Sequence, residues 1–153
     1  MGKFLKFVGI VSLIMFTLVT VGLVYLFSTG SGLDDSSQKY ADSIIENNVK
    51  GWKTPIPYDQ LSLEFKESMS EEDLKKFWTK LSTVGDATNI TEGIGEAKVN
   101  YIFDKGKSVT ASYKYVADYE SCKANIYVNL KQESEIWKVY GFKFMSVNNL
   151  DCF

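Results

Sequence analysis

A run of 21 residues without a charged side chain, Phe7–Phe27, constrains this chain more than any other feature. An α-helix of that length is about 30 Å long, which matches the hydrocarbon thickness of a bilayer. Lys3 and Lys6 precede the run, and Asp34 and Asp35 follow it. By the positive-inside rule, this charge pattern predicts a cytoplasmic N-terminus and a domain on the other side of the membrane.

The length of the apolar run distinguishes two kinds of N-terminal segment. A cleaved signal peptide has an apolar core of about 7–15 residues, which is shorter than this run. We therefore predict an uncleaved signal anchor, while the small residues Ser28–Gly30 leave cleavage open as the alternative. The predicted organisation is a cytoplasmic tail, a transmembrane helix, a flexible linker and an extracytoplasmic domain, at residues 1–6, 7–27, 28–35 and 36–153.

Charge narrows the classes of partner for this domain. The chain of 153 residues contains no arginine, so its 17 basic residues are all lysines, a composition that also fits a low-GC genome. Without Lys3 and Lys6, 15 lysines remain against 19 acidic residues, a net charge of about −4. A mildly acidic domain without arginine is a poor clamp for phosphate or nucleic acid. We therefore expect no nucleic-acid partner.

The chain also contains no histidine, which bears on catalysis. Its absence excludes Ser-His-Asp and Cys-His nucleophiles and removes the commonest metal ligand and neutral-pH general base. The sequence has no clustered Asp pattern of the kind that binds calcium. We expect no enzyme activity, no cofactor and no metal site, and a hydrolase or isomerase that uses Asp or Tyr is the alternative.

The first part of the domain has helical periodicity. Residues 34–37 supply acidic and serine caps, and the apolar positions Tyr40, Ile44, Ile45 and Val49 follow at helical spacing. These positions predict an amphipathic helix that ends near Gly51.

Two further helices are predicted before residue 86. Tyr58–Glu67 is a weaker helical stretch, and Ser70–Asp73 has the pattern of a capping box. The helix that follows the capping box ends before Gly85 and has an apolar face made of Leu74, Phe77, Trp78 and Leu81.

From residue 97 onward the hydrophobic period changes from helical spacing to two. Alternating segments cover residues 97–103, 109–117 and 124–130, and an aromatic segment covers residues 135–144. Helices followed by four or five hairpin-connected strands predict an α+β domain. We expect two to three helices packed on one face of a bent antiparallel sheet.

The two cysteines, Cys122 and Cys152, lie 30 residues apart in the predicted extracytoplasmic domain. An even number of cysteines outside the cytoplasm predicts one disulfide, and two free thiols are the alternative. The pair lacks C-x-x-C spacing, so a redox motif or a zinc site is not expected.

Aromatic side chains on the predicted strands suggest a binding face. In the last strand, Trp137 and Val139 share one face, which we expect to pack on the first helix. The other face is expected to contact a partner or the C-terminal tail. The alternative for the hairpin aromatics is that they form the core. The candidate binding face consists of Tyr101, Phe103, Tyr113, Tyr115, Tyr140, Phe142 and Phe144.

Several short motifs occur in a fixed order along the domain. They are Phe65, Ser68, Ser70-Glu-Glu-Asp-Leu74, Trp78, Leu81, Gly85 and Trp137-Lys-Val-Tyr-Gly-Phe142. In this order and spacing they resemble the small secreted or membrane-tethered members of the nuclear transport factor 2-like (cystatin-like) superfamily. The similarity is greatest to bacterial domain-of-unknown-function families of that fold, and it covers roughly residues 36–147.

The resemblance implies a cone-shaped domain, in which a strongly bent sheet wraps around helices and leaves a cavity at the wide end. Enzymes of the superfamily place an Asp, Tyr or His in that cavity. Asp104 and Asp118 match no such position, and both lie beside predicted turns, where aspartate is common. No catalytic residue is therefore carried over to this chain.

Many members of the superfamily are dimerising or scaffolding modules, and single-pass subunits of type IV secretion machines share the predicted architecture. We therefore expect a protein of the bacterial cytoplasmic (inner) membrane whose domain faces the periplasm or the cell exterior. It would act through protein contacts, as a homodimer or as an accessory subunit of a membrane complex. The alternative is a domain that binds a small apolar ligand in the cone cavity.

Overall fold

The structure is a computed structural model that describes residue 19, residues 32–102, residues 106–147 and residue 152. The predicted transmembrane segment at 7–27 lies outside the described residues, apart from residue 19. Among the described residues, no helix has both the length and the apolar character needed to cross a membrane. The chain divides into two compact units, Met1–Leu33 and Asp34–Phe153, and the second unit is the α+β domain.

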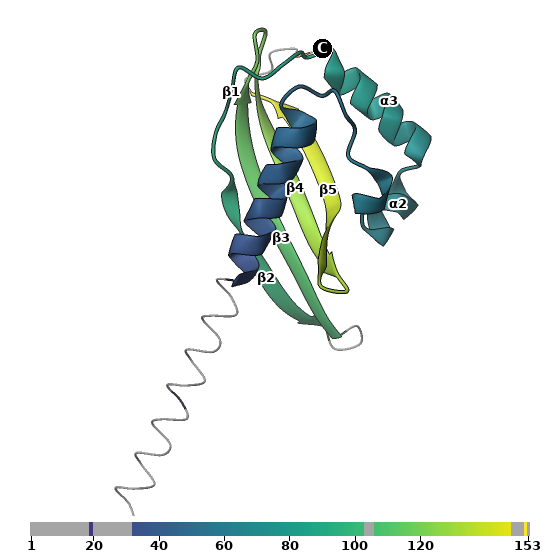
Figure 1. Cartoon of the computed structure of the whole chain (residues 1–153), viewed down its shortest axis with the longest axis vertical. Coiled ribbons are helices and arrows are strands. Elements are labelled where there is room, and N and C mark those ends of the chain that lie inside the picture. The colour runs from purple at the N-terminus through teal and green to yellow at the C-terminus, as the bar shows by residue number, and fades with distance from the viewer. Residues whose placement is uncertain (1–18, 20–31, 103–105, 148–151, 153) are drawn as a thin grey trace, which may run out of the picture. The chain divides into compact units, whose positions relative to one another are not determined.

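The domain is built on a five-stranded antiparallel sheet, which confirms the predicted fold class (Figure 1). Four strands lie in the order β1-β3-β4-β5. The fifth strand, β2, pairs with β3, which is also the partner of β1. Strand β1 has only two residues, too few for an alternating pattern, and it was not predicted. The strands are β1 (Asn89–Ile90), β2 (Ile94–Ile102), β3 (Gly106–Asp118), β4 (Lys123–Glu133) and β5 (Ile136–Ser146).

The predicted first helix is present and is called the long helix here. Its α-helical residues 32–44 continue into the π-helical turn η1 (Ile45–Val49), which ends where the Lys50 N–H donates to the Ile45 carbonyl. Residues 32–35, at the end of the predicted linker 28–35, are helical. Figure 1 shows the long helix across one face of the sheet, and its predicted apolar positions Ile44, Ile45 and Val49 are buried.

The start of the long helix is tied to the sheet by side-chain hydrogen bonds. Asp34 Oδ1 accepts from the Ala97 N–H at 2.6 Å, and Ser36 Oγ accepts from Trp137 Nε1 at 3.0 Å. Ser37 Oγ lies 2.7 Å from the Tyr113 hydroxyl. The prediction that the Trp137 face packs on the first helix is confirmed.

The prediction of one continuous helix over residues 58–67 is wrong. The chain forms a 3-10 turn, η2 (Tyr58–Gln60), and then a separate helix, α2 (Leu63–Ser68). The break occurs because Leu61 forms a parallel bridge with Val139, to whose carbonyl the Ser62 N–H donates at 2.9 Å. Pairing with strand β5 therefore replaces the local helical hydrogen bonds.

Helix α3 (Glu71–Ser82) forms where the sequence predicts it. Ser70 Oγ accepts from the Asp73 N–H at 3.1 Å, which confirms the predicted cap. Leu74, Trp78 and Leu81 are buried along the predicted apolar face.

The prediction for the faces of the last strand is wrong for Phe142 and Phe144. Asn129 pairs with Gly141 but Leu130 pairs with Val139, so Tyr140 is an extra residue that forms a β-bulge. A bulge of one residue reverses the alternation of side chains beyond it. Phe142 and Phe144 therefore lie on the same face as Val139 and point toward the helices.

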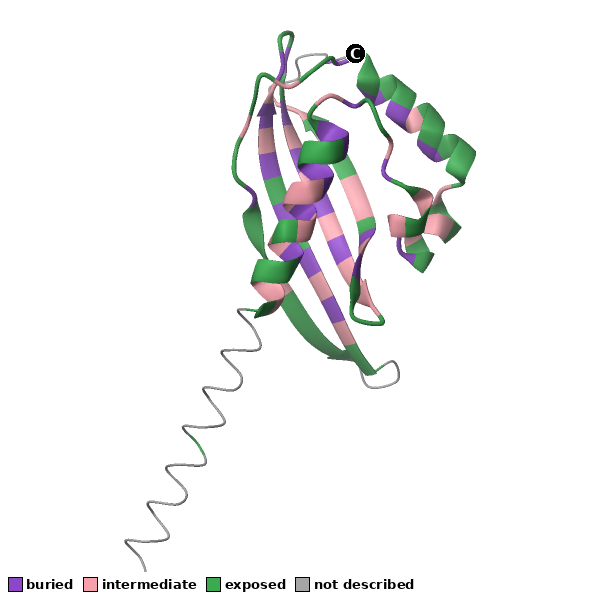
Figure 2. Ribbon diagram, viewed as in Figure 1, coloured by how far each residue is buried: buried purple, intermediate pink, exposed green. Residues whose placement is uncertain are grey.

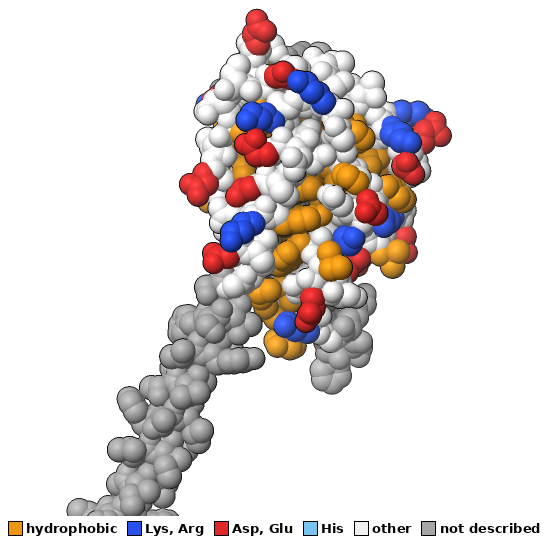
Figure 3. All heavy atoms as spheres, viewed as in Figure 1, with side chains coloured by type: hydrophobic (Ala, Val, Ile, Leu, Met, Phe, Trp, Pro, Cys, Tyr) orange, Lys and Arg blue, Asp and Glu red, His pale blue; other side chains and the backbone are white. Residues whose placement is uncertain are grey.

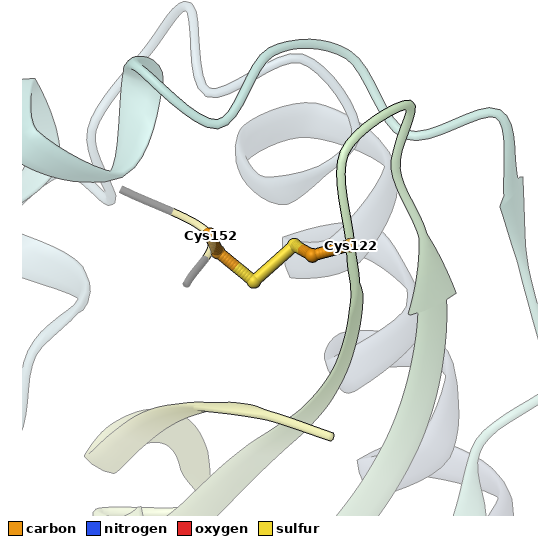
Figure 4. The surroundings of a disulfide bond; sticks show 2 residues. All are labelled: Cys122 and Cys152. Atoms are coloured by element: carbon orange, nitrogen blue, oxygen red, sulfur yellow. A yellow bond between two sulfur atoms is a disulfide. The ribbon is translucent and has the colours of Figure 1, made fainter. Parts of the chain in front are cut away.

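The core lies between the long helix and the inner face of the sheet. Buried positions alternate with partly exposed ones along β3 and β4, as Figure 2 shows. The predicted disulfide between Cys122 and Cys152 is present, with 5.5 Å between the Cα atoms (Figure 4). It ties the C-terminal end of the chain to the start of β4.

Candidate functional site

A surface groove of about 660 Å³ lies between helix α3 and the loop that follows the long helix. Its volume falls within the range of about 300–1,000 Å³ that is typical of ligand sites. We call it the tryptophan groove, because two tryptophans line it. The lining residues are Gly51, Trp52, Lys53 and Pro55 from the loop and Lys75, Trp78, Thr79 and Ser82 from α3.

The loop wall is held by a buried polar side chain at the end of the long helix. Asn48 is 5% exposed, and its Nδ2 donates to the carbonyls of Thr54 and Pro55 at 3.1 and 3.2 Å. Trp52 has a φ of 51°, in the left-handed region that bulky residues avoid. Such a conformation costs about 1–3 kcal/mol and persists only where the surroundings fix it.

The helical wall is one face of α3. Lys75, Trp78, Thr79 and Ser82 follow the spacing i, i+3, i+4 and i+7, which places them along one side of a helix. The Thr79 hydroxyl donates to the Lys75 carbonyl at 2.9 Å, and the Ser82 hydroxyl donates to the Thr79 carbonyl at 2.7 Å. Both hydroxyl hydrogens are therefore engaged within the helix.

Aromatic rings pack around the two tryptophans and join both walls to strand β5. The ring centroids of Trp52 and Trp78 are 5.4 Å apart in an edge-to-face arrangement. Phe142 contacts both indoles at 6.2 and 5.6 Å, and Phe144 contacts Trp52 at 5.7 Å. Such contacts favour a fixed arrangement of the rings.

Within the described part of the chain, Trp78 Nε1 has no hydrogen-bond partner, and Trp52 Nε1 and the Tyr119 hydroxyl have none apart from each other. The residues are 3%, 2% and 6% exposed. Burial raises the pKa of Tyr119, and the nearby Trp52 indole offsets part of that rise. A buried donor without a partner costs about 1–3 kcal/mol, so the Trp78 N–H lowers the stability of the fold.

The charged side chains that line the groove are two lysines, and each is paired with a carboxylate outside the lining. Lys53 and Lys75 line it, and no Asp or Glu is among its described lining residues. The Lys53 ammonium lies 3.9 Å from Asp86, and the Lys75 ammonium lies 3.0 Å from Glu71. All four side chains are more than half exposed, so these ion pairs are weak and easily exchanged.

The seven residues of the predicted binding face lie in different places. Tyr113 and Tyr115 are each 2% exposed, and their hydroxyls face the long helix, where Tyr115 donates to Asp42 Oδ1 at 2.7 Å. Tyr101 and Tyr140 are exposed, and Phe103 lies outside the described residues. Phe142 and Phe144 pack in the aromatic cluster beside the groove.

Exposed hydrophobic side chains also lie at several places on the surface of the domain. On the face shown in Figure 3, hydrophobic side chains reach the surface beside the long helix, toward α2 and α3, among charged side chains of both signs. Large exposed hydrophobic side chains include Leu63, Tyr101, Ile136 and Tyr140.

Sequence reasoning missed the groove and placed Trp78 on an apolar helix face and in a family motif. The available signal was a second tryptophan, Trp52, placed between Gly51 and the two prolines Pro55 and Pro57. A large apolar residue in such a loop needs a packing partner, and Trp78 supplies it.

Among the described residues, no group of three or more Cys, Asp or Glu side chains could hold a metal ion. Asp118 forms an exchangeable surface pair with Lys123 at 3.0 Å, and the hydrogen bond from Lys123 lowers the pKa of the Asp118 carboxyl. Asp104 lies outside the described residues.

Comparison of the chain with protein-family models, with curated proteins and with solved structures gives no match in any of the three. The function of the groove is therefore argued from its own geometry and chemistry.

Proposed function

We propose that the protein is a membrane-anchored, extracytoplasmic binding module that holds a segment of a partner protein in the tryptophan groove. One observation carries this proposal: a solvent-accessible groove of about 660 Å³ has a tryptophan on each wall, Trp52 on the loop and Trp78 on α3. Tryptophan is enriched among the residues that contribute most to protein–protein binding.

The packing of the core favours a surface groove over the small-ligand alternative. In the space between the long helix and the sheet, Ile44, Ile45, Val49, Ile126 and Val128 are at most 3% exposed. Side chains thus occupy the region in which the cone cavity would have to open. The groove instead lies between the loop and α3, where a polypeptide segment has access from solvent.

The remaining parts of the proposal concern location and family. We place residues 7–27 in the cytoplasmic membrane of a bacterium as a signal anchor, with the domain in the periplasm or at the cell exterior. The Cys122–Cys152 disulfide supports this location, because disulfides persist in oxidising compartments. The cone-shaped nuclear transport factor 2-like fold, a homodimer or accessory-subunit role and the lack of enzyme activity belong to the same proposal.

Site-specific photo-cross-linking in membranes tests the proposed function. Benzoylphenylalanine replaces Thr79 inside the groove of the full-length chain, and in a matched control it replaces Lys76 on another side of the same helix. We expect one discrete cross-linked product from position 79 and none of that mass from position 76. Equal products from both positions, or none from position 79, would overturn the groove as the binding site.

A further inference from the structure

Strand β2 forms one edge of the sheet, because within the described chain it pairs only with β3. In an antiparallel ladder the N–H and C=O of one residue point to the same side, and that side alternates along the strand. The Ala97 N–H donates to Asp34 Oδ1 at 2.6 Å and therefore points away from β3. The backbone groups of Val99 and Tyr101 follow the same period, so they also point outward.

Hydrogen bonds made by β3 support this assignment. The Thr91 N–H donates to the Val116 carbonyl at 2.9 Å, and the Val116 N–H donates to Thr91 Oγ1 at 2.9 Å. The even-numbered residues of β3 therefore direct their backbone groups to the side on which β1 and β2 lie. In the register of the two strands, each of these residues is opposite an even-numbered residue of β2. The odd-numbered residues of β2 thus have their backbone groups on the open side.

The two edges of the sheet are covered to different extents. The opposite edge, strand β5, is covered in part by the segment before α2. On β2 the long helix covers Ala97 through Asp34, but no described residue hydrogen-bonds to the outward groups of Val99 or Tyr101. The side chains of these two residues are 40% and 81% exposed. An open edge with exposed apolar side chains is a template for pairing with another chain.

Charge distinguishes the two halves of β2. In the first half, Glu96 and Lys98 form an exposed ion pair with each other at 2.8 Å. Charged side chains on an edge strand oppose its pairing with another chain. The second half, residues 99–102, has the sequence Val-Asn-Tyr-Ile and no charge. The part of the edge without charges is therefore the part that has free backbone groups.

The second half of β2 is complementary to a second copy of itself. Two antiparallel copies can pair so that Val99 of each faces Tyr101 of the other, with Asn100 at the symmetry axis. The outward backbone groups of both residues then form hydrogen bonds in both copies. Each valine contacts a tyrosine, and such pairs of a β-branched and an aromatic side chain stabilise sheets. The ladder ends where Asp34 already accepts from the Ala97 N–H.

We propose that two copies of the protein associate through the open edge of β2, in the register that pairs Val99 with Tyr101. This inference rests on the proposed function, because it names the surface through which the proposed homodimer forms. The ladder is short, and the proposed membrane anchor would favour it by keeping the copies close together.

Disulfide cross-linking of the full-length chain in membranes tests this pairing. The two native cysteines are bonded to each other, so a newly introduced thiol has no other thiol within the chain. Asn100→Cys places the new thiol directly opposite its own copy, where the Cβ atoms of an antiparallel pair lie about 4.5–5.5 Å apart. We expect an oxidant to convert N100C into a disulfide-linked dimer.

The matched control is Lys98→Cys, on the same face of the same strand. In the proposed register Lys98 is opposite Ile102 of the second copy. The two thiols of K98C would therefore be about 13 Å apart along the strands, at about 3.3 Å per residue, which is too far for a disulfide. We expect no linked dimer from this variant.

A pair of lysine substitutions in the N100C chain tests the ladder itself. V99K places a charge within the ladder, and I94K places the same charge on the same strand outside it. We expect V99K to lower the yield of linked dimer about tenfold, which corresponds to the loss of both valine–tyrosine pairs. I94K should change the yield by less than about twofold, because Ile94 is 79% exposed and has no partner in the ladder.

Val99→Pro is a second variant of the ladder. It removes the outward N–H and leaves the hydrogen bonds to β3 in place, which is where proline is tolerated in an edge strand. This variant should also lower the yield of linked dimer from N100C.

Three results would overturn the proposal: no linked dimer from N100C, equal yields from N100C and K98C, or equal effects of V99K and I94K. If the proposal fails in one of these ways while the cross-link from position 79 persists, β2 is not the dimer surface and the groove function stands. If N100C forms the linked dimer and position 79 gives no product, the pairing of β2 stands and the groove is not the binding site.

Discussion

At the residue scale, the buried polar side chains of this domain fall into two groups. Tyr113 and Tyr115 lie beneath the long helix, and both hydroxyls have partners there, Ser37 and Asp42. The indole N–H of Trp78 has none within the described chain. Paired groups stabilise the fold and an unpaired one costs free energy, so the two tyrosines stabilise the domain and the Trp78 N–H does not.

The hydrogen bond from Tyr115 to Asp42 gives a prediction about alkaline pH. Burial, with the hydrogen bond to Asp42, raises the pKa of Tyr115 above the ordinary value of about 10. The neutral phenol is therefore favoured in the folded state. This stabilisation is fully present below about pH 10 and is lost as the pH rises from there toward the folded-state pKa.

Tyr115→Phe should lower the free energy of unfolding at neutral pH by about 1.5–3 kcal/mol, because it removes a hydrogen bond to a carboxylate. It should also make the fall in stability above pH 10 less steep. Urea unfolding between pH 7 and pH 11 measures both effects. The control is Tyr101→Phe at an 81% exposed position, which should leave the neutral-pH stability unchanged. Equal losses in the two variants would contradict the assigned role of Tyr115.

At the element scale, the hairpin between β4 and β5 depends on two residues in unfavourable conformations. Ser134 and Glu135 have φ values of 48° and 66° and form a two-residue turn. Positive φ at both central positions is the type I′ geometry, which Asn-Gly adopts most readily. This sequence therefore forms the turn without the residues that favour it.

Replacing Ser134-Glu135 by Asn-Gly should raise the free energy of unfolding by about 0.5–1 kcal/mol, because it relieves the left-handed strain at both positions. Thermal and urea unfolding measure the change. Gly at position 136 instead, where β5 has begun, is the control and should destabilise the domain. A loss of stability in the Asn-Gly variant would show that the turn has another geometry.

The same elements show how much of the fold the sequence predicts. Helix α3 was predicted because its cap, apolar face and terminating Gly85 are local signals, and the alternation of β3 and β4 is equally local. The bulge at Tyr140 and the break at Leu61 were not predicted, because both depend on pairing with a distant strand. The groove was missed for the same reason, since its walls come together through Trp52 and Trp78, which are distant in the sequence.

At the scale of the whole molecule, the disulfide and the aromatic cluster connect parts of the chain that are distant in the sequence. The Cys122–Cys152 disulfide closes a loop of 30 residues, which contributes about 3–4 kcal/mol in the chain-entropy model. Tyr119, whose N–H donates to the Cys122 carbonyl at 2.8 Å, packs against Phe144 and Trp52 in the aromatic cluster. The disulfide therefore supports the same cluster that underlies the groove.

The central claim is our proposal that this cluster supports a groove that receives a segment of a partner protein, in a chain that we propose is anchored in a membrane. The most direct test is the yield of the cross-link from position 79, measured in membranes that contain the full-length chain with K75E or with K76E. We predict that K75E lowers the yield about tenfold and that K76E leaves it nearly unchanged, because only Lys75 lines the groove. Equal yields from the two variants would contradict the account.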